Sequence, residues 1–222
     1  MTYPGGETKP RVMLYCFLIS VLFVGVLADN AAETTSYVDN VLEHSLPESL
    51  YRHHLGFIPF PPFNISTQKE ALRFDKGSSF GFFDQLKRSG NCSSSHWLWF
   101  NVTFGCYLSV DDSNIHYDVT FNTETVQQNF TAFFLSENSS IWVSFTQQGQ
   151  SPVHVQVKLS GVDFTTLFSE EPKLDKETLQ RVMDAAQRVV KKMVSDLLTD
   201  RFRTALEESI KDLPLPLPST TF

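Results

Sequence analysis

A long segment near the C-terminus, residues 174–213, constrains the fold more than any other part of this chain. It contains neither Gly nor Pro, Asp175 can cap its first turn, and Pro214 stops it. A helix of this length spans about 55–60 Å at 1.5 Å per residue, which is longer than a compact domain of this size needs. Such a helix therefore requires a large apolar surface to lie on.

The apolar residues of this segment change face along its length. The first stripe at helical spacing consists of Leu179, Val182, Met183, Ala186, Val190, Met193, Val194 and Leu197. The later apolar residues lie on a different side of the helix at about 100° per residue, and they are Leu198, Phe202, Leu206, Ile210 and Leu213. We therefore expect that the two halves bury different faces or that the helix bends near residues 199–201. A coiled coil would keep a single seam, so the pattern disfavours one.

The middle of the chain, about residues 73–168, alternates apolar and polar side chains in the manner of strands. In the stretch 97–110 the inward face is Leu98, Phe100, Val102, Phe104, Cys106, Leu108 and Val110. Further inward positions are Tyr117, Val119, Phe121, Phe130, Ala132, Phe134, Ile141, Val143, Phe145, Val153, Val155, Val157 and Leu159. Polar turns are expected at residues 111–114, 136–140 and 147–152. The pattern predicts about four to six antiparallel strands with one apolar face.

Residues 1–28 have the form of a secretory signal peptide. Lys9 and Arg11 precede a long apolar run, and Val26 and Ala28 fit the small-residue positions of a cleavage site. A signal anchor is the alternative, because such a run could just span a bilayer. We expect cleavage after Ala28 and a secreted, extracellular protein without stable membrane insertion.

The remaining residues, 29–222, are expected to form one domain. We expect disorder over about residues 29–35 and again over about residues 214–222. Between them, Ser36 can cap a short helix that ends near Pro47. The apolar face of this helix is Val38, Val41, Leu42 and Leu46.

Cysteine usage and glycosylation sequons agree with secretion. Cys16 lies within the signal peptide, so Cys92 and Cys106 are left as a pair that we expect to form a disulfide rather than remain two buried thiols. Sequons of the form N-x-[ST] occur at Asn64, Asn91, Asn101, Asn129 and Asn138. We expect several of them to carry glycans. Asn91 is the weakest, because oxidation of the neighbouring Cys92 competes with its modification.

Charge and the lack of chemical motifs exclude several classes of protein. The formal net charge is −7, and loss of the signal peptide makes it one unit more negative, so nucleic acid and anionic membrane surfaces are poor partners. The sequence contains no H-E-x-x-H, P-loop or Gly-rich dinucleotide motif, and its six histidines are scattered. We therefore expect no enzymatic activity, no cofactor and no metal site.

Four short stretches and the order of the elements carry a resemblance to a known family. The stretches are residues 83–90 (FDQLKRSG), 159–164 (LSGVDF), 202–206 (FRTAL) and 210–216 (IKDLPLP). The chain resembles the group 7 mite allergens, arthropod proteins of the tubular lipid-binding superfamily that also contains the bactericidal/permeability-increasing proteins. It departs from the group 7 pattern in the pair Cys92 and Cys106, in a shorter N-terminal helix and in its density of sequons.

The resemblance implies both a fold and a class of ligand. The implied fold is α+β, with a strongly curved antiparallel sheet wrapped on a long C-terminal α-helix and a short N-terminal helix. A lipocalin barrel is disfavoured, because it keeps its helix short. The implied partner is a lipid or another apolar small molecule, held in a crevice between sheet and helix. The residues expected to line that crevice are Phe100, Val102, Phe104, Val119, Phe121, Met183, Val190, Met193 and Leu197.

Two functions therefore stay open from the sequence. The first is a carrier or sensor of a hydrophobic ligand, because flexible thioethers such as Met183 and Met193 adapt to varied apolar ligands. An innate-immune role belongs to this first function. The second is a secreted interaction or immune-modulating protein whose core is filled and binds no small ligand. No particular oligomeric state is predicted.

Overall fold

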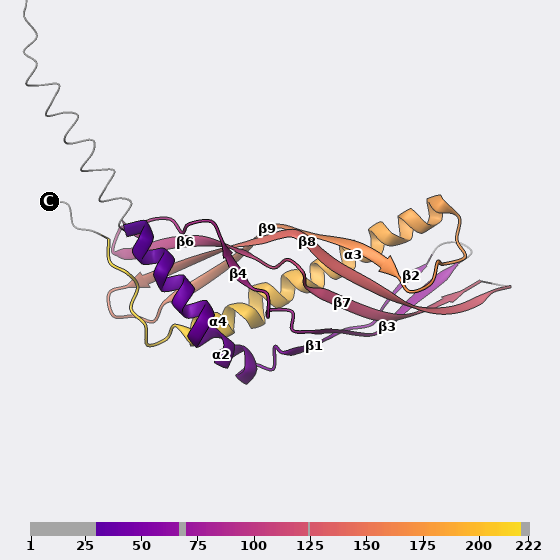
Figure 1. The fold of residues 1–222 in the computed structure, drawn as a ribbon, viewed down its shortest axis with the longest axis horizontal. Helices are drawn as coiled ribbons and strands as arrows, with labels where there is room; N and C mark the ends of the chain where they lie inside the picture. The colour runs from indigo at the N-terminus through magenta and orange to yellow at the C-terminus, as the bar shows by residue number, and fades with distance from the viewer. Residues whose placement is uncertain (1–29, 67–69, 124, 219–222) are drawn as a thin grey trace, which may run out of the picture.

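The computed structural model describes residues 30–66, 70–123 and 125–218. The predicted signal peptide and its cleavage site lie outside the described residues. Within the described part, one nine-stranded antiparallel sheet and two long helical segments form an elongated molecule (Figure 1). No helix among the described residues is both long and apolar enough to cross a membrane.

The strands follow the order β1-β3-β7-β8-β6-β4, and β2, β5 and β9 pair with β3, β6 and β8 respectively. Their bounds are β1 (Phe57–Phe60), β2 (Phe63–Ser66), β3 (Ala71–Phe80), β4 (Lys87–Ser89), β5 (His96–Leu98), β6 (Asn101–Ser109), β7 (Asn114–Asn122), β8 (Gln127–Gln148) and β9 (His154–Phe168).

Strand β8, with 22 residues, is the longest strand of the sheet and pairs with β6, β7 and β9. Its first part pairs with β7 and its second part with β6, so these two strands lie one after the other along the same edge. Strand β9 pairs with the opposite edge of β8. Figure 1 shows β6 and β7 toward opposite ends of the molecule.

The turn predicted at residues 136–140 is wrong, because β8 runs through this segment. The polar side chains that suggested a turn hold a bulge in the strand, where the register shifts between Glu137 and Ser140. Ser139 N–H donates to Asp111 Oδ1 at 2.5 Å, and Ser139 Oγ accepts from Asp163 N–H at 3.1 Å. Side chains thus replace the ladder hydrogen bonds that the bulge removes.

The predicted inward faces of the strands are confirmed, except at residues 98–100. The buried members are Val102, Phe104, Cys106, Leu108, Val110, Tyr117, Val119, Phe121, Phe130, Ala132, Phe134, Ile141, Val143, Phe145, Val153, Val155 and Val157, and Leu159 is half-buried. The inward placement of Leu98 and Phe100 is wrong. Trp99 has a φ of 60° and the chain reverses there, so Leu98 pairs with Asn101 and Phe100 is 79% exposed.

The C-terminal helix consists of α3 (Lys176–Leu197), a π-helical turn η2 (Leu198–Phe202) and α4 (Arg203–Ser209). Asp175 caps it as predicted, since Asp175 Oδ1 accepts from Thr178 N–H at 3.0 Å, and this hydrogen bond lowers the pKa of Asp175. The π-helical turn includes residues 199–201, where the sequence predicted a change of face. The helix ends at Ser209, four residues earlier than expected.

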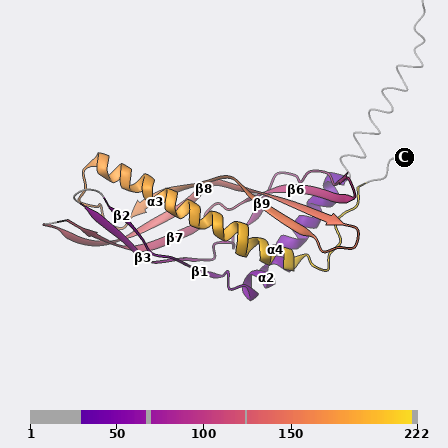
Figure 2. The same cartoon turned by 180° about the vertical axis from the view of Figure 1, so that it is seen from behind.

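One stripe of buried side chains recurs at every fourth residue along this helix. It consists of Thr178, Val182, Ala186, Val190, Val194, Leu198, Phe202, Leu206 and the C-cap residue Ile210, and Leu197 and Ala205 are buried beside it. In an α-helix such a stripe drifts by about 40° per step, because 3.6 residues complete a turn. The wider π-helical turn reduces this drift where α3 passes into α4. Figure 2 shows α3 running along the length of the molecule in front of the strands.

The N-terminal helix is longer than the sequence predicted. It covers residues 30–40, a π-helical turn η1 (Val41–Ser45) and α2 (Leu46–Arg52). Residues 30–35 are helical instead of disordered, and the buried Thr34 hydroxyl donates to Ser93 O at 2.9 Å. Pro47 does not end the helix. Leu46 N–H reaches back to Val41 O in the π-helical turn, which places Pro47 in the first turn of α2, where a missing N–H costs little.

The chain after α4 is also ordered where it is described. Leu215 is buried, and its N–H donates to Gln147 Oε1 at 3.0 Å. The disorder expected over residues 214–218 is therefore wrong, and residues 219–222 lie outside the described part.

Candidate functional site

The residues predicted to line one crevice do not form one site. Two groups of these residues lie on different strands, Val102 and Phe104 on β6 and Val119 and Phe121 on β7. Phe104 pairs with Phe145 and Val119 pairs with Phe130, so the two groups meet β8 at positions fifteen residues apart. At about 3.3 Å per residue this is roughly 50 Å of strand. Local alternation identified the buried faces of β6 and β7 correctly, but it could not reveal that these strands lie end to end.

Each group has its own neighbours. Phe104 stacks on Phe145 with ring centroids 4.9 Å apart, and Tyr37 of the N-terminal helix covers both rings edge-on. Burial raises the pKa of Tyr37, whose hydroxyl donates to Leu213 O at 3.3 Å. At the other end, Val119 and Phe121 lie in the core, as does Val102 near Phe104. The N-terminal helix therefore covers a part of the sheet that was expected to face α3.

The helix side of the predicted crevice is filled at its central residue. Val190 has no exposed surface, and Leu197 is also buried. A side chain that lined a water-sized cavity would retain accessible surface, so the packing at Val190 leaves no such space. Met183 and Met193 are half-buried, and Phe100 lies at the tip of the β5–β6 hairpin.

Replacing Val190 with Trp is expected to lower the free energy of unfolding by about 1–3 kcal/mol, because the larger ring overpacks a filled site. Met193→Trp on the same helix is the matched control, since Met193 is half-buried and lines an open depression. Thermal unfolding of both variants measures the difference. Equal stability of Val190→Trp and the wild type would mean that a crevice exists there after all.

The depression beside Met193 has a volume of about 260 Å³. Its walls are Ile58, Pro59, Phe60, Pro61, Met193, Asp196, Leu197, Asp200 and Arg201. Met193 and Leu197 are thus the two predicted ligand residues that line this depression. The Tyr117 hydroxyl lies 3.4 Å from Met193 Sδ and 3.2 Å from Pro61 O.

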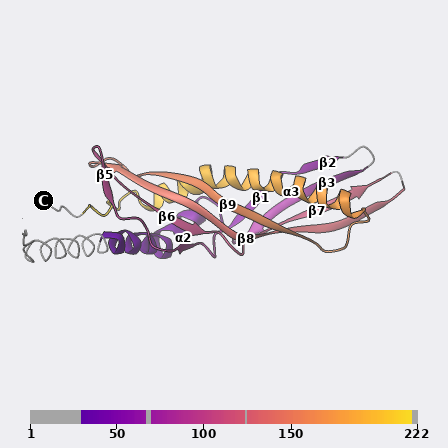
Figure 3. The ribbon, with the colours of Figure 1, turned by 90° about the horizontal axis from the view of Figure 1, so that it is seen from above.

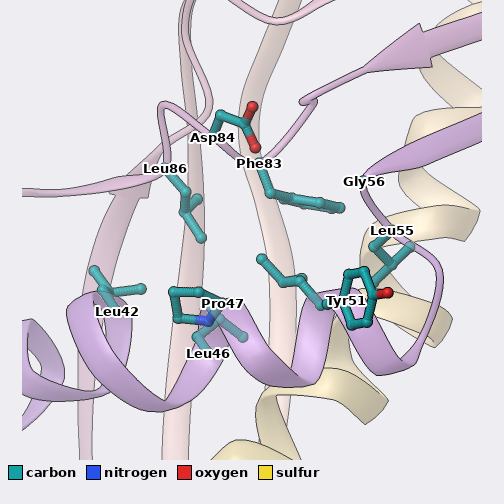
Figure 4. Close-up of a pocket in the computed structure, with 10 residues that line it drawn as sticks. Leu42, Leu46, Pro47, Tyr51, Leu55, Gly56, Phe83, Asp84 and Leu86 are labelled. Atoms are coloured by element: carbon teal, nitrogen blue, oxygen red, sulfur yellow. The ribbon is translucent and has the colours of Figure 1, made fainter.

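A larger apolar pocket lies between the N-terminal helix and the turn that follows β3. It has a volume of about 420 Å³ and is lined by Leu42, Leu46, Pro47, Leu50, Tyr51, Leu55, Gly56, Phe83, Asp84 and Leu86. Figure 4 shows these side chains on the helix and on the facing turn. We refer to it as the leucine pocket. The sequence interpretation missed it, although Leu42, Leu46 and Leu50 recur at a spacing of four residues on one helix face.

Backbone geometry holds the two walls of the leucine pocket together. Gly81 N–H donates to Gly56 O at 3.0 Å and ties the turn to the loop after α2. Gly81 has a φ of 61°, and a Cβ there would lie 2.2 Å from Asp84 Oδ2, so the turn requires glycine. Behind the pocket, Phe83 stacks on Phe202 of η2 with ring centroids 4.8 Å apart.

Polar contacts fix α2 onto α4 below the pocket. The buried Ser49 hydroxyl donates to Ala205 O at 2.7 Å. Glu208 contacts His53 Nε2 at 2.6 Å and also pairs with Arg52, and the hydrogen bond from His53 lowers the pKa of Glu208. The pocket wall therefore stands on two helices that are joined at several points.

The leucine pocket offers binding surface rather than reacting groups. Its polar side chains are the Asp84 carboxylate and the Tyr51 hydroxyl, and Tyr51 is largely exposed. Among the described residues, no group of three or more His, Cys, Asp or Glu is placed to hold a metal ion. The absence of enzymatic activity stays a prediction.

The predicted disulfide between Cys92 and Cys106 is confirmed, with Cα atoms 4.5 Å apart. It joins the loop before β5 to the middle of β6. Of the sequon residues, Asn64, Asn91, Asn129 and Asn138 are exposed and Asn101 is half-buried. Their glycosylation stays a prediction.

Two solved structures are similar to this one. The crystal structure of lipopolysaccharide binding protein is 12% identical, with a TM-score of 0.39, over 81% of this chain and 37% of that chain. The chain thus spans little more than a third of that protein. The crystal structure of Takeout 1 from Epiphyas postvittana is 12% identical, with a TM-score of 0.36, over 84% of this chain and 94% of that chain. No family model and no curated protein matches the sequence. Kinship with the group 7 mite allergens stays a prediction.

Proposed function

We propose that this protein binds a hydrophobic or lipid-like molecule in the leucine pocket. The observation that carries the proposal is the pocket itself, whose volume of about 420 Å³ falls in the range of small-molecule sites and half of whose lining residues are leucines. Contacts of this kind give affinity through buried apolar area and shape, so specificity is broad. The depression beside Met193 is a smaller second candidate for the same class of ligand.

Asp84 selects among such ligands. It is the one acidic residue that lines the pocket, and its carboxylate repels a ligand that carries a negative charge nearby. No Lys or Arg side chain lines the pocket to compensate. The ligand class that fits best is therefore a neutral apolar chain, such as a long-chain alcohol or ester, rather than an ionised fatty acid.

The cellular setting belongs to the same proposal. A signal peptide cleaved after Ala28, the disulfide and the exposed sequon residues support a secreted glycoprotein with a carrier or innate-immune role. The proposal includes a sheet that curves strongly around α3. Such a sheet would contact α3 over a long surface, and the complete burial of Val190 supports this.

The second candidate is a secreted interaction protein that binds no small ligand. The observation that favours it is the filled packing at Val190 and Phe121, which leaves no space for a ligand around these two side chains. In that case the leucine pocket is a surface groove without a resident molecule.

Binding of Nile red, a neutral apolar dye, separates the two candidates. We expect its fluorescence to rise with the wild-type protein and its affinity to fall by about tenfold in Leu50→Trp, because the indole fills part of the pocket. Leu159→Trp is the control, since Leu159 is also half-buried but lies on β9. Dodecanol should displace the dye at lower concentration than dodecanoate, and Asp84→Asn should narrow that difference.

Two results would contradict ligand binding in the leucine pocket. One is the absence of any dye binding by the folded wild-type protein. The other is equal loss of binding in Leu50→Trp and Leu159→Trp, which would place the dye outside the leucine pocket. The first result leaves the interaction protein as the better description, and the second assigns the dye to another site, such as the depression beside Met193.

A further inference from the structure

The tip of the β5–β6 hairpin exposes four bulky apolar side chains in a row. Trp97, Leu98, Trp99 and Phe100 are 54%, 52%, 88% and 79% exposed. Leu98 pairs with Asn101, so Trp99 and Phe100 form the two-residue turn itself. Figure 3 places β5 at one end of the elongated molecule. We call these four residues the aromatic tip.

The aromatic tip contributes little to the core of its own chain. Single exposed apolar residues are common, but a run of four on a protruding turn marks a surface that meets another apolar phase or partner. The tip is convex, whereas a site that receives a small molecule is concave. Its shape therefore fits a broad, deformable surface better than a single small ligand.

The charge around the tip differs from that of the whole chain. No Asp or Glu occurs between residues 85 and 110 or between residues 138 and 162, although the formal net charge is −7. These segments include β5, β6 and the part of β8 that pairs with β6, so they lie together. These segments therefore bring no acidic side chain to the tip, which favours contact with a lipid headgroup layer.

We propose that the aromatic tip docks the protein on a phospholipid surface by inserting into its interfacial layer. Trp is suited to that layer, because its ring is apolar while its indole N–H can hydrogen-bond at the wet side. Insertion buries Trp99 and Phe100 first, since they are the most exposed of the four. This docking uses residues outside the leucine pocket and holds whether or not the pocket binds a ligand.

Glycosylation of Asn101 would regulate this docking. Its sequon lies two residues from Trp99, and a glycan there stands beside the tip. A hydrated glycan resists entry into the interfacial layer, so occupied Asn101 weakens docking. The glycosylated protein and its Asn101→Gln variant are therefore compared in the same assay.

Flotation with phosphatidylcholine vesicles tests the proposal. All measurements use Trp142→Phe, which leaves Trp97 and Trp99 as the tryptophans of the chain, so that intrinsic emission reports on the tip alone. We expect co-flotation with the vesicles and a shift of emission to shorter wavelength, both stronger in Asn101→Gln. Trp99→Ser combined with Phe100→Ser should lower vesicle affinity by at least about tenfold. Phe80→Ser is the matched control, since Phe80 is 72% exposed outside the tip.

Each other outcome overturns the proposal. Failure of folded, monomeric Asn101→Gln to float with the vesicles excludes lipid docking. Equal binding by the tip variant and Phe80→Ser places the contact elsewhere on the surface. A concentration-dependent dimer that the tip variant abolishes, without vesicle binding, assigns the tip to a second copy of the chain. Nile red binding in the same samples reports the leucine pocket separately.

Discussion

Replacing Phe202 with Ala is expected to lower the free energy of unfolding by about 3–5 kcal/mol, the largest effect predicted for a single residue here. Phe202 is fully buried in η2 and stacks on Phe83, which forms a wall of the leucine pocket. Its removal leaves a cavity where the π-helical turn meets the turn after β3. Urea unfolding followed by circular dichroism measures the loss.

The control for this variant is Phe80→Ala, which removes a ring that is mostly exposed. It should change the free energy of unfolding by no more than about 0.5 kcal/mol. A loss below about 1 kcal/mol for Phe202→Ala would contradict the buried position of its ring. Because Phe83 stacks on Phe202, the variant should also loosen the leucine pocket and weaken Nile red binding.

Removing the disulfide by the double substitution Cys92→Ala and Cys106→Ala is expected to destabilise the fold by about 3 kcal/mol, the loop-closure value for a crosslink of about 15 residues. The loop that the disulfide closes also contacts the start of the N-terminal helix. Cys92 N–H donates to Thr35 Oγ1 at 3.1 Å, and Asn30 Nδ2 donates to Ser95 O at 3.2 Å. Loss of the crosslink therefore loosens this end of the helix as well as the loop.

Urea unfolding of the wild type with and without a reductant provides the second measurement. Reductant should lower the stability of the wild type toward that of the double variant and leave the double variant unchanged. Hydrogen exchange should show faster exchange at residues 30–35 in the double variant than at the middle of β8. A double variant as stable as the oxidised wild type would falsify the structural role of the disulfide.

Several features of the fold follow from local sequence and were predicted from it. Alternation identified the inward faces of β7 and β9, because successive side chains of a strand point to opposite sides. The cap at Asp175 and the pairing of Cys92 with Cys106 also required little beyond the local sequence and the count of cysteines. The change of apolar face near residues 199–201 coincides with η2. A π-helical turn changes the helical pitch, so apolar residues on both sides of it can stay buried.

Where local signals failed, contacts distant in the sequence had overridden them. The polar residues 136–140 suggested a turn, yet hydrogen bonds between Ser139 and both Asp111 and Asp163 keep β8 continuous. Alternation predicted that Leu98 and Phe100 are buried, but a φ of 60° at Trp99 reverses the chain. Pro47 suggested a helix end, and the preceding π-helical turn accommodates it.

The sequence by itself determined most of the buried faces of the strands, where the long helix begins and which cysteines pair, because these depend on periodicity and composition within one segment. Only the tertiary structure decided the sites. Strands β6 and β7 lie end to end along β8, so the nine residues of the predicted crevice were separated. The leucine pocket instead joins residues 42–56 to residues 83–86. Strand order and helix docking are set by contacts between distant segments, and no local period encodes them.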